Sequence, residues 1–173
     1  MDCGFLPVPV PNNTDIVERM VTTFDPAGII FTGGNDLARY GGDAPERDKT
    51  EELLLQIAIE KDIPLYGFCR GMQLILNHYG CELSKISGHV AVEHVINGTI
   101  GNRTVNSFHN YGCTEKGDYV GNGTIEVLAR AEDGVTEAIR VKDKRIFGTM
   151  WHPERSNSFQ KEDIDFVKEL FNK

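Results

Sequence analysis

The segment around Cys69 places the strongest constraint on the fold, because it joins a strand to a helix through a tight turn. Residues 63–66 (IPLY) form an apolar run of strand type, and residues 72–79 (MQLILNHY) have the apolar spacing of a helix. Between these runs, Gly67 and Gly71 stand two residues on either side of Cys69. Glycines there permit a sharp turn that holds the cysteine in a strained, exposed position. The pattern predicts a nucleophile elbow.

The same turn places the sulfur of Cys69 at the N-terminus of a helix. The helix dipole and the free amide groups favour a thiolate at that position, so we expect the pKa of Cys69 to be lowered. Cys3, Cys81 and Cys113 have no nearby base in the sequence and are expected to be core or surface thiols.

Residues 151–154 (WHPE) contain the partners that a cysteine nucleophile requires. A nucleophile needs a base, and the base needs a third group that fixes its tautomer. Residues 145–151 (RIFGTMW) are a strand candidate, and residues two apart beyond a strand project to the same side. His152 and Glu154 are therefore the candidate base and orienting group. The alternative, two surface loop residues and a buried apolar Cys69, is weakened because the motifs occur together.

Apolar strand-like runs alternate with helical segments through the first half of the chain. The expected strands are residues 5–10, 27–31 and 63–66, and the expected helices are residues 14–24, 48–61 and 72–79. This alternation predicts an α/β fold, a three-layer, flavodoxin-like parallel sheet with helices on both faces. A small antiparallel addition and a closing helix are expected from residues 90–95, 125–129, 137–141 and 163–172.

Composition limits the classes of function. The length of 173 residues indicates one domain, spanning residues 1–173, with room for a real core. A net charge of −8 without a run of basic residues argues against nucleic acid or an anionic membrane as a partner. No signal peptide, transmembrane stretch or C-x-x-C spacing is visible, so we expect reduced thiols and a cytoplasmic location.

The order of these motifs, with residues 32–36 (TGGND) upstream, resembles the class I glutamine amidotransferase superfamily. Residues 69–73 (CRGMQ) resemble its γ-glutamyl hydrolase branch, the peptidase C26 group. Ammonia-channelling glutaminases more often carry an aliphatic or aromatic residue where Arg70 stands. Residues 47–51 (RDKTE) and 105–110 (VNSFHN) are similar to the same branch.

The chain departs from the family at its front, where the usual opening strand and helix are missing. We therefore expect residues 5–10 to pair poorly and the sheet to expose an edge. Met1 is interpreted as an internal methionine of a longer natural chain.

The resemblance implies an oxyanion hole beside the elbow. Attack of a cysteine on an amide carbonyl creates an oxyanion that needs two aimed N–H donors. One donor is expected from Arg70, directly after the nucleophile, and the other from Gly34, because only glycine lets the backbone approach a substrate so closely. The alternative is that Gly33 and Gly34 form only a tight turn. The Arg70 side chain is expected to pair with Glu51 or Asp48.

Substrate contacts are also implied by the resemblance. The expected substrate-binding residues are Gly33, Gln73, Ser107, Phe108 and His109. The competing interpretations are a solvated helix position for Gln73 and a packed core histidine for His109.

A metal site would need more ligands than the sequence offers in one place. His89 and His94, near Glu93, are five apart, which is wrong for a shared helix face, and no further ligand cluster follows. We therefore expect no metal and no cofactor, and His89 is expected to contact a leaving group.

Taken together, the resemblance implies a cysteine-dependent hydrolase that cleaves a small-molecule γ-glutamyl amide through a γ-glutamyl thioester. Candidate substrates are γ-glutamyl-γ-aminobutyrate and a γ-glutamyl nucleoside-diphosphate amidate. One alternative is a glutaminase subunit that delivers ammonia to a synthetase partner, which Cys69-Arg70-Gly71 disfavours. Another is a non-enzymatic cysteine redox sensor, which does not need His152 and Glu154. A homodimer is compatible with all of these.

Overall fold

The computed structural model describes residues 3–156 and 159–172. The helices are α1 (Thr14–Phe24), α2 (Pro45–Lys61), α3 (Arg70–His78) and α4 (Lys161–Phe171), with 3₁₀ turns at Ala38–Tyr40 and Pro153–Arg155. The main sheet contains β1 (Ile29–Phe31), β2 (Leu65–Phe68), β4 (Val90–Gly98), β5 (Arg103–Phe108), β7 (Tyr119–Val120), β8 (Ile125–Ala131), β9 (Thr136–Val141) and β10 (Ile146–Thr149). A two-stranded sheet pairs β3 (Ser84–Lys85) with β6 (Tyr111–Gly112).

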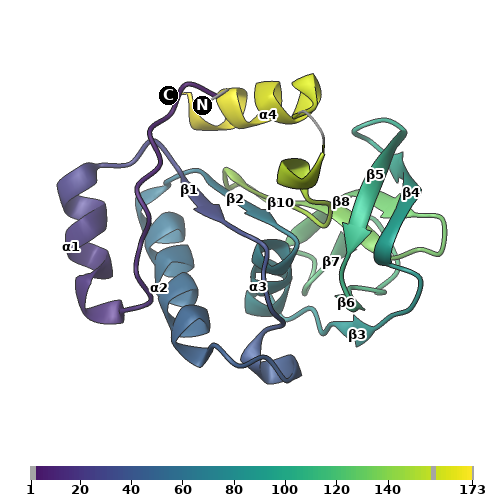
Figure 1. Ribbon diagram of the computed structural model, residues 1–173, viewed down its shortest axis with the longest axis horizontal. Helices are drawn as coiled ribbons and strands as arrows, with labels where there is room; N and C mark the ends of the chain where they lie inside the picture. The colour runs from purple at the N-terminus through teal and green to yellow at the C-terminus, as the bar shows by residue number, and fades with distance from the viewer. Residues whose placement is uncertain (1–2, 157–158, 173) are drawn as a thin grey trace.

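The main sheet changes from parallel to antiparallel along its order β1-β2-β10-β9-β8-β4-β5. Strands β1, β2 and β10 are parallel neighbours, and every pairing from β10 to β5 is antiparallel. The parallel strands lie among the helices, and the antiparallel strands curl away from them (Figure 1). The expected α/β class is confirmed, with an antiparallel part that extends further than the sequence indicated, because β5 was not predicted.

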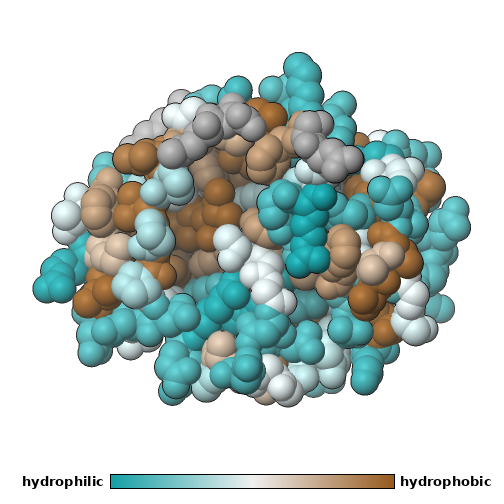
Figure 2. Space-filling view, viewed as in Figure 1, coloured by the Kyte–Doolittle hydropathy of each residue, from teal (hydrophilic) through white to brown (hydrophobic). Residues whose placement is uncertain are grey.

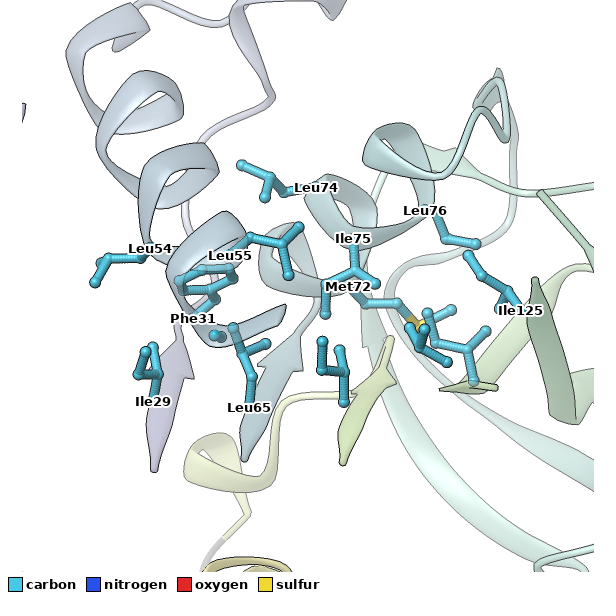
Figure 3. Close-up of a cluster of buried hydrophobic side chains, with 14 of the residues drawn as sticks. Ile29, Phe31, Leu54, Leu55, Leu65, Met72, Leu74, Ile75, Leu76 and Ile125 are labelled. Carbon is cyan, nitrogen blue, oxygen red and sulfur yellow. The ribbon is translucent and has the colours of Figure 1, made fainter. Parts of the chain in front are cut away.

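Helices cover both faces of the parallel strands, as expected. Alternate residues of β2 point to opposite faces, so Leu65 packs toward α2 and α3 while Tyr66 packs toward α4. Figure 3 shows Leu65 in the first of these cores, beside Phe31 and Met72. On the other face, the ring of Phe166 lies 5.6 Å from that of Tyr66, in an edge-to-face arrangement. Each fully buried Leu or Phe contributes about 1.5–3 kcal/mol to folding.

The predicted strand at residues 5–10 is wrong. This segment has no regular structure, because Pro7 and Pro9 cannot donate hydrogen bonds to a neighbouring strand. It is anchored by Phe5, whose ring packs edge-on against Phe171 of α4 at 5.6 Å. Strand β1 consequently stands at one end of the sheet order, in line with the expectation that residues 5–10 pair poorly.

Apolar surface accompanies this edge. Figure 2 shows apolar residues gathered where the N-terminal segment, α1 and β1 lie in Figure 1. The exposed large hydrophobic residues of these segments are Leu6, Val8, Val10, Phe24 and Ile30. In the described part of the chain, no helix has the length and apolar character needed to cross a membrane.

Helix boundaries follow local capping chemistry. Helix α1 spans the expected residues 14–24 and is capped by Asn13, whose Oδ1 accepts the backbone N–H of Asp15 at 2.9 Å. Helix α2 begins with Pro45, three residues before the expected start at Asp48, because a proline without N–H is tolerated in the first turn.

Candidate active site

Cys69 occupies a strained turn between β2 and α3. Its backbone angles are φ 50° and ψ −107°, a region that residues with a β-carbon rarely adopt. A β-carbon on Gly67 would lie 2.7 Å from the carbonyl carbon of Gly71, and one on Gly71 would lie 2.5 Å from the carbonyl oxygen of Phe31. Both glycines are therefore required by close backbone contacts, and the predicted strand–turn–helix is present.

The thiol of Cys69 is buried, at 4% exposure, which reverses its expected acidity. The pKa of Cys69 is raised to about 12, chiefly by burial and also by the nearby charge of Glu154, while the backbone amide of Arg70 acts in the opposite direction. The predicted lowering of this pKa is wrong for the free protein, because loss of hydration outweighs the helix terminus. A thiolate can then form only when a base accepts the proton.

His152 follows β10 and is held at both its backbone and its ring. The Asn106 side-chain amide donates to the carbonyl oxygen of His152 at 2.8 Å and accepts its N–H at 2.8 Å. Nδ1 of His152 lies 2.6 Å from Oε1 of Glu154, so Nδ1–H donates to the carboxylate and Nε2 carries the lone pair. Nε2 is buried and has no hydrogen-bond partner among the described residues. The arrangement leaves a basic nitrogen available.

Glu154 remains ionised beside this ring. Burial raises the pKa of Glu154, but the hydrogen bond with His152, a backbone hydrogen bond and the charges of His152 and Arg155 together hold the pKa below its ordinary value. A carboxylate in this position stabilises the imidazolium that forms when Nε2 accepts a proton.

Cys69 and His152 lie beyond the carboxyl ends of two adjacent parallel strands. Phe68 of β2 pairs with Thr149 of β10, and the N–H of Cys69 donates to the carbonyl oxygen of Thr149 at 2.7 Å. A β-carbon on Gly33 would lie 2.6 Å from Cε1 of His152, so the glycine loop after β1 also reaches the imidazole. Ligands of open α/β sheets bind at this edge.

The peptide between Gly33 and Gly34 is oriented by Arg47. The guanidinium donates to the carbonyl oxygen of Gly33 at 3.2 Å and to that of Thr32 at 2.8 Å. Because C=O and N–H of a trans peptide point in opposite directions, the N–H of Gly34 turns away from Arg47. Gly34 also has φ 153°, and a β-carbon there would lie 2.4 Å from Nη1 of Arg47, so this glycine lets the guanidinium pack closely against the loop. Sequence reasoning did not assign this role to Arg47.

Arg70 is buried at 1% exposure and forms ion pairs with Asp48 and Glu51 of α2. The expected pairing is present with both carboxylates. Glu51 also pairs with Arg47 at 2.8 Å, and Asp48 accepts the backbone N–H of Ala38 at 2.7 Å. This network links the elbow to α2 and to the loop after β1.

A cleft of about 410 Å³ opens beside the elbow. Its lining residues are Gly34, Asn35, Asp36, Gly41, Gly42, Asp43, Cys69, Gln73, Phe108, His109 and Asn110. Gly34, Cys69, Gln73, Phe108 and His109 were predicted site residues, and the structure brings them together here. A separate hollow of about 530 Å³ around Lys85 and Asp133 contains none of the predicted site residues.

Several polar groups near the cleft are engaged by the backbone. The side-chain amide of Gln73 donates to the carbonyl oxygen of Tyr111 at 3.0 Å, and Nδ1 of His109 donates to the same oxygen at 3.0 Å. Ser107 is fully buried, its hydroxyl donates to the carbonyl oxygen of His89 at 2.8 Å, and it lies outside the cleft lining. Its hydroxyl supports the strand that carries Phe108.

Two clusters were not expected from the sequence. His89 and His109 converge on Glu137 of β9, so the prediction that no further ligands gather near His89 is wrong. Cys81 and Cys113 are both buried, with sulfur atoms 2.6 Å apart. Pairings between residues so distant in sequence leave no local pattern.

Comparison with known proteins agrees with this geometry. A family model described as glutamine amidotransferase class-I matches residues 1–170. The chain is 34% identical over 146 residues to a gamma-glutamyl-CDP-amidate hydrolase from Campylobacter jejuni. The match covers 83% of this chain and 69% of that protein. The chain is also 29% identical over 164 residues to a glutamine-hydrolyzing GMP synthase subunit from Methanosarcina mazei. This match covers 90% of the chain and 77% of the relative.

A solved structure shares the fold. The crystal structure of a candidate GMP synthase subunit from Thermoplasma acidophilum superposes with a TM-score of 0.71 at 18% identity. The superposition covers 94% of this chain and 77% of the other. With the family match over nearly its whole length, the chain belongs to the class I glutamine amidotransferase family.

Proposed function

We propose that this chain is a cysteine-dependent hydrolase that cleaves a γ-glutamyl amide to glutamate and an amine or amidate. The observation that carries the proposal is the strained turn that places Cys69 in a cleft, with the His152–Glu154 pair beyond the adjacent strand. The similarity to a gamma-glutamyl-CDP-amidate hydrolase supports a nucleoside-diphosphate amidate as the substrate class. γ-Glutamyl-γ-aminobutyrate is a second candidate.

The proposed reaction passes through a thioester. Nε2 of His152 accepts the thiol proton as the sulfur of Cys69 attacks the γ-carbonyl carbon. The C–N bond then breaks, and the leaving nitrogen takes the proton from His152. Water next gives a proton to His152 and adds to the thioester carbon, which releases glutamate and returns the proton to the sulfur. The raised pKa of Cys69 fits transfer at the moment of attack, because the resting thiol is protonated.

Backbone N–H groups would stabilise the oxyanion in both steps. The amide of Arg70 lies at the start of α3, directly after Cys69, and as a hydrogen-bond donor it acts to lower the pKa of that thiol, which supports its role as the first donor. The N–H of Gly34, turned away from Arg47, is the proposed second donor.

The cleft offers complementary groups for both ends of the substrate. Carboxylates of Asp36 and Asp43 line it and suit the α-ammonium of a γ-glutamyl group. The guanidinium of Arg155 lies 4.3 Å over the ring of Phe108, which lines the cleft, and suits an anionic leaving group. Gln73, Ser107 and His109 are proposed to shape the wall rather than to react.

A substrate panel tests this proposal. We expect the chain alone to release glutamate from a γ-glutamyl nucleoside-diphosphate amidate or from γ-glutamyl-γ-aminobutyrate faster than from glutamine. Glutamate release is measured for each compound under the same conditions. Turnover of glutamine alone, strengthened by an added synthetase, would instead support the glutaminase subunit. The similarity to the GMP synthase subunit from Methanosarcina mazei is the observation that favours this second function.

The roles of the base and its partner can be separated. His152→Ala should lower kcat by about 10²–10⁴-fold, the usual contribution of a positioned acid–base group. Glu154→Gln should lower kcat less, because it keeps a hydrogen bond to Nδ1 but loses the charge that stabilises the imidazolium. Glu82→Gln, an exposed carboxylate, is the control and should be unaffected. Equal activity of Glu154→Gln and the parent would show that Glu154 has no role in orienting His152 and is only a surface carboxylate.

A further inference from the structure

Three histidines and one glutamate meet in the interior, behind the wall of the cleft. Glu137 of β9 is fully buried, and the side chains of His89 and His109 are 3% and 1% exposed. His94 of β4 lies beside them, and the ring centroids of His89 and His94 are 4.8 Å apart. A carboxylate without water is costly unless a positive charge faces it.

The distances in this cluster match ligands that share one ion. Nδ1 of His89 and Nε2 of His109 each lie 3.4 Å from Oε1 of Glu137. Nε2 of His94 lies 3.5 Å from the same oxygen. Two ligands bound to a tetrahedral zinc ion at about 2.0–2.2 Å stand about 3.4 Å apart. The three distances are long for charge-assisted hydrogen bonds, which are about 2.7–2.9 Å.

Four of the facing atoms have no hydrogen-bond partner among the described residues, while Nδ1 of His89 lies 3.5 Å from the Ser107 hydroxyl. The four are both carboxylate oxygens of Glu137, Nε2 of His109 and Nε2 of His94. Nδ1 of His109 donates to the carbonyl oxygen of Tyr111, and its Nε2 faces Glu137 at 3.4 Å. A cation between the rings and the carboxylate would give these atoms a common partner.

The histidines also have the outer partners that metal ligands have. Nε2 of His89 lies 2.9 Å from Oδ2 of Asp133, which leaves Nδ1 of His89 to face Glu137. A carboxylate or a backbone carbonyl on the second ring nitrogen fixes the tautomer and strengthens the ligand. Asp133 supplies this contact for His89, and the carbonyl of Tyr111 supplies it for His109.

We propose that His89, His109 and Glu137 bind a divalent zinc ion with water as the fourth ligand, while His94 lies beside the site. The nitrogen-rich set favours zinc over calcium or magnesium, which prefer oxygen ligands. The site stands apart from the proposed nucleophile and base, because His89 directly precedes β4, His109 directly follows β5 and Glu137 lies in β9. The ion would tie β4, β5 and β9 together behind the cleft wall. The N–H of Met150, two residues before His152, donates to the carbonyl oxygen of Glu137 at 2.8 Å.

Metal content tests this site directly. Cys69→Ala protein, prepared with zinc and purified without chelators, should carry about one zinc ion per chain by mass spectrometry of the metals. Using Cys69→Ala separates the result from turnover and from zinc on that thiol. Stripped protein should bind cobalt(II) with the visible absorption of a tetrahedral site. Zinc returned to stripped protein should raise the melting temperature.

Variants locate the ion. Glu137→Gln should lose zinc, and Asp133→Asn, at a half-exposed position, should weaken zinc affinity by about 10–100-fold without unfolding. His78→Gln, which alters a partly buried histidine–glutamate pair at 2.5 Å elsewhere, should retain the ion. Cys113→Ser should also retain it, which excludes the Cys81–Cys113–Glu115 group. Zinc that survives in Glu137→Gln but not in Cys113→Ser would overturn the proposal, as would protein that neither holds nor responds to zinc or cobalt.

Discussion

Replacing Cys69 with alanine or serine should abolish glutamate release while the protein stays folded. Covalent catalysis depends on the sulfur itself, and loss of a nucleophile lowers turnover by several orders of magnitude. The fold does not depend on the sulfur in the same way, because the turn is set by the contacts of Gly67 and Gly71. Glutamate release and circular dichroism of the variants, compared with the parent, provide the measurement.

The matched control is Cys81→Ala, which removes another buried thiol, three residues beyond the C-terminal end of α3. Its turnover should stay close to that of the parent. Intact activity in Cys69→Ala would rule out the proposed thioester mechanism for this chain. Loss of activity in both variants, with loss of structure, would point to packing rather than chemistry.

Replacing Arg70 with methionine should lower the free energy of unfolding by about 3–5 kcal/mol, as expected when one partner of a buried ion pair is removed. The substitution keeps the volume of the stem but leaves Asp48 and Glu51 without the cation that both contact. Arg47 still pairs with Glu51, so the loss falls mainly on Asp48 and on the loop that it holds through Ala38. Urea unfolding monitored by circular dichroism measures the change.

Arg140→Met provides the comparison for this prediction. Arg140 pairs with Glu126 at 2.5 Å, but its side chain is 47% exposed, and exposed pairs contribute only about 0–1 kcal/mol. A similar small change in both variants would mean that the Arg70 network does not stabilise the fold.

Local patterns were enough to predict the strand, turn and helix around Cys69. Such patterns record contacts within a few residues, such as the glycines that flank the turn. Strand β5 was missed although its burial alternates in part, because four of its six residues, among them Asn106 and Ser107, are polar. Those polar groups bond to His152 and His89, which lie far away in sequence.

The remaining errors also come from long-range contacts. The acidity of Cys69 was mispredicted because helix position is visible in a sequence but burial is not. Arg47 and Glu137 were not assigned because their partners come from other elements of the fold. Residue type and spacing therefore predict which groups can react, while the folded chain decides which of them meet.

The backbone at Cys69 sets stability against function. A residue with a β-carbon at φ 50° and ψ −107° costs about 1–3 kcal/mol, which glycine would avoid. Selection for stability alone would therefore replace this cysteine with glycine and erase the proposed nucleophile. Any engineering that stabilises this chain by choosing residues to fit its backbone must therefore keep Cys69, because glycine, which fits this backbone without strain, lacks the proposed nucleophile.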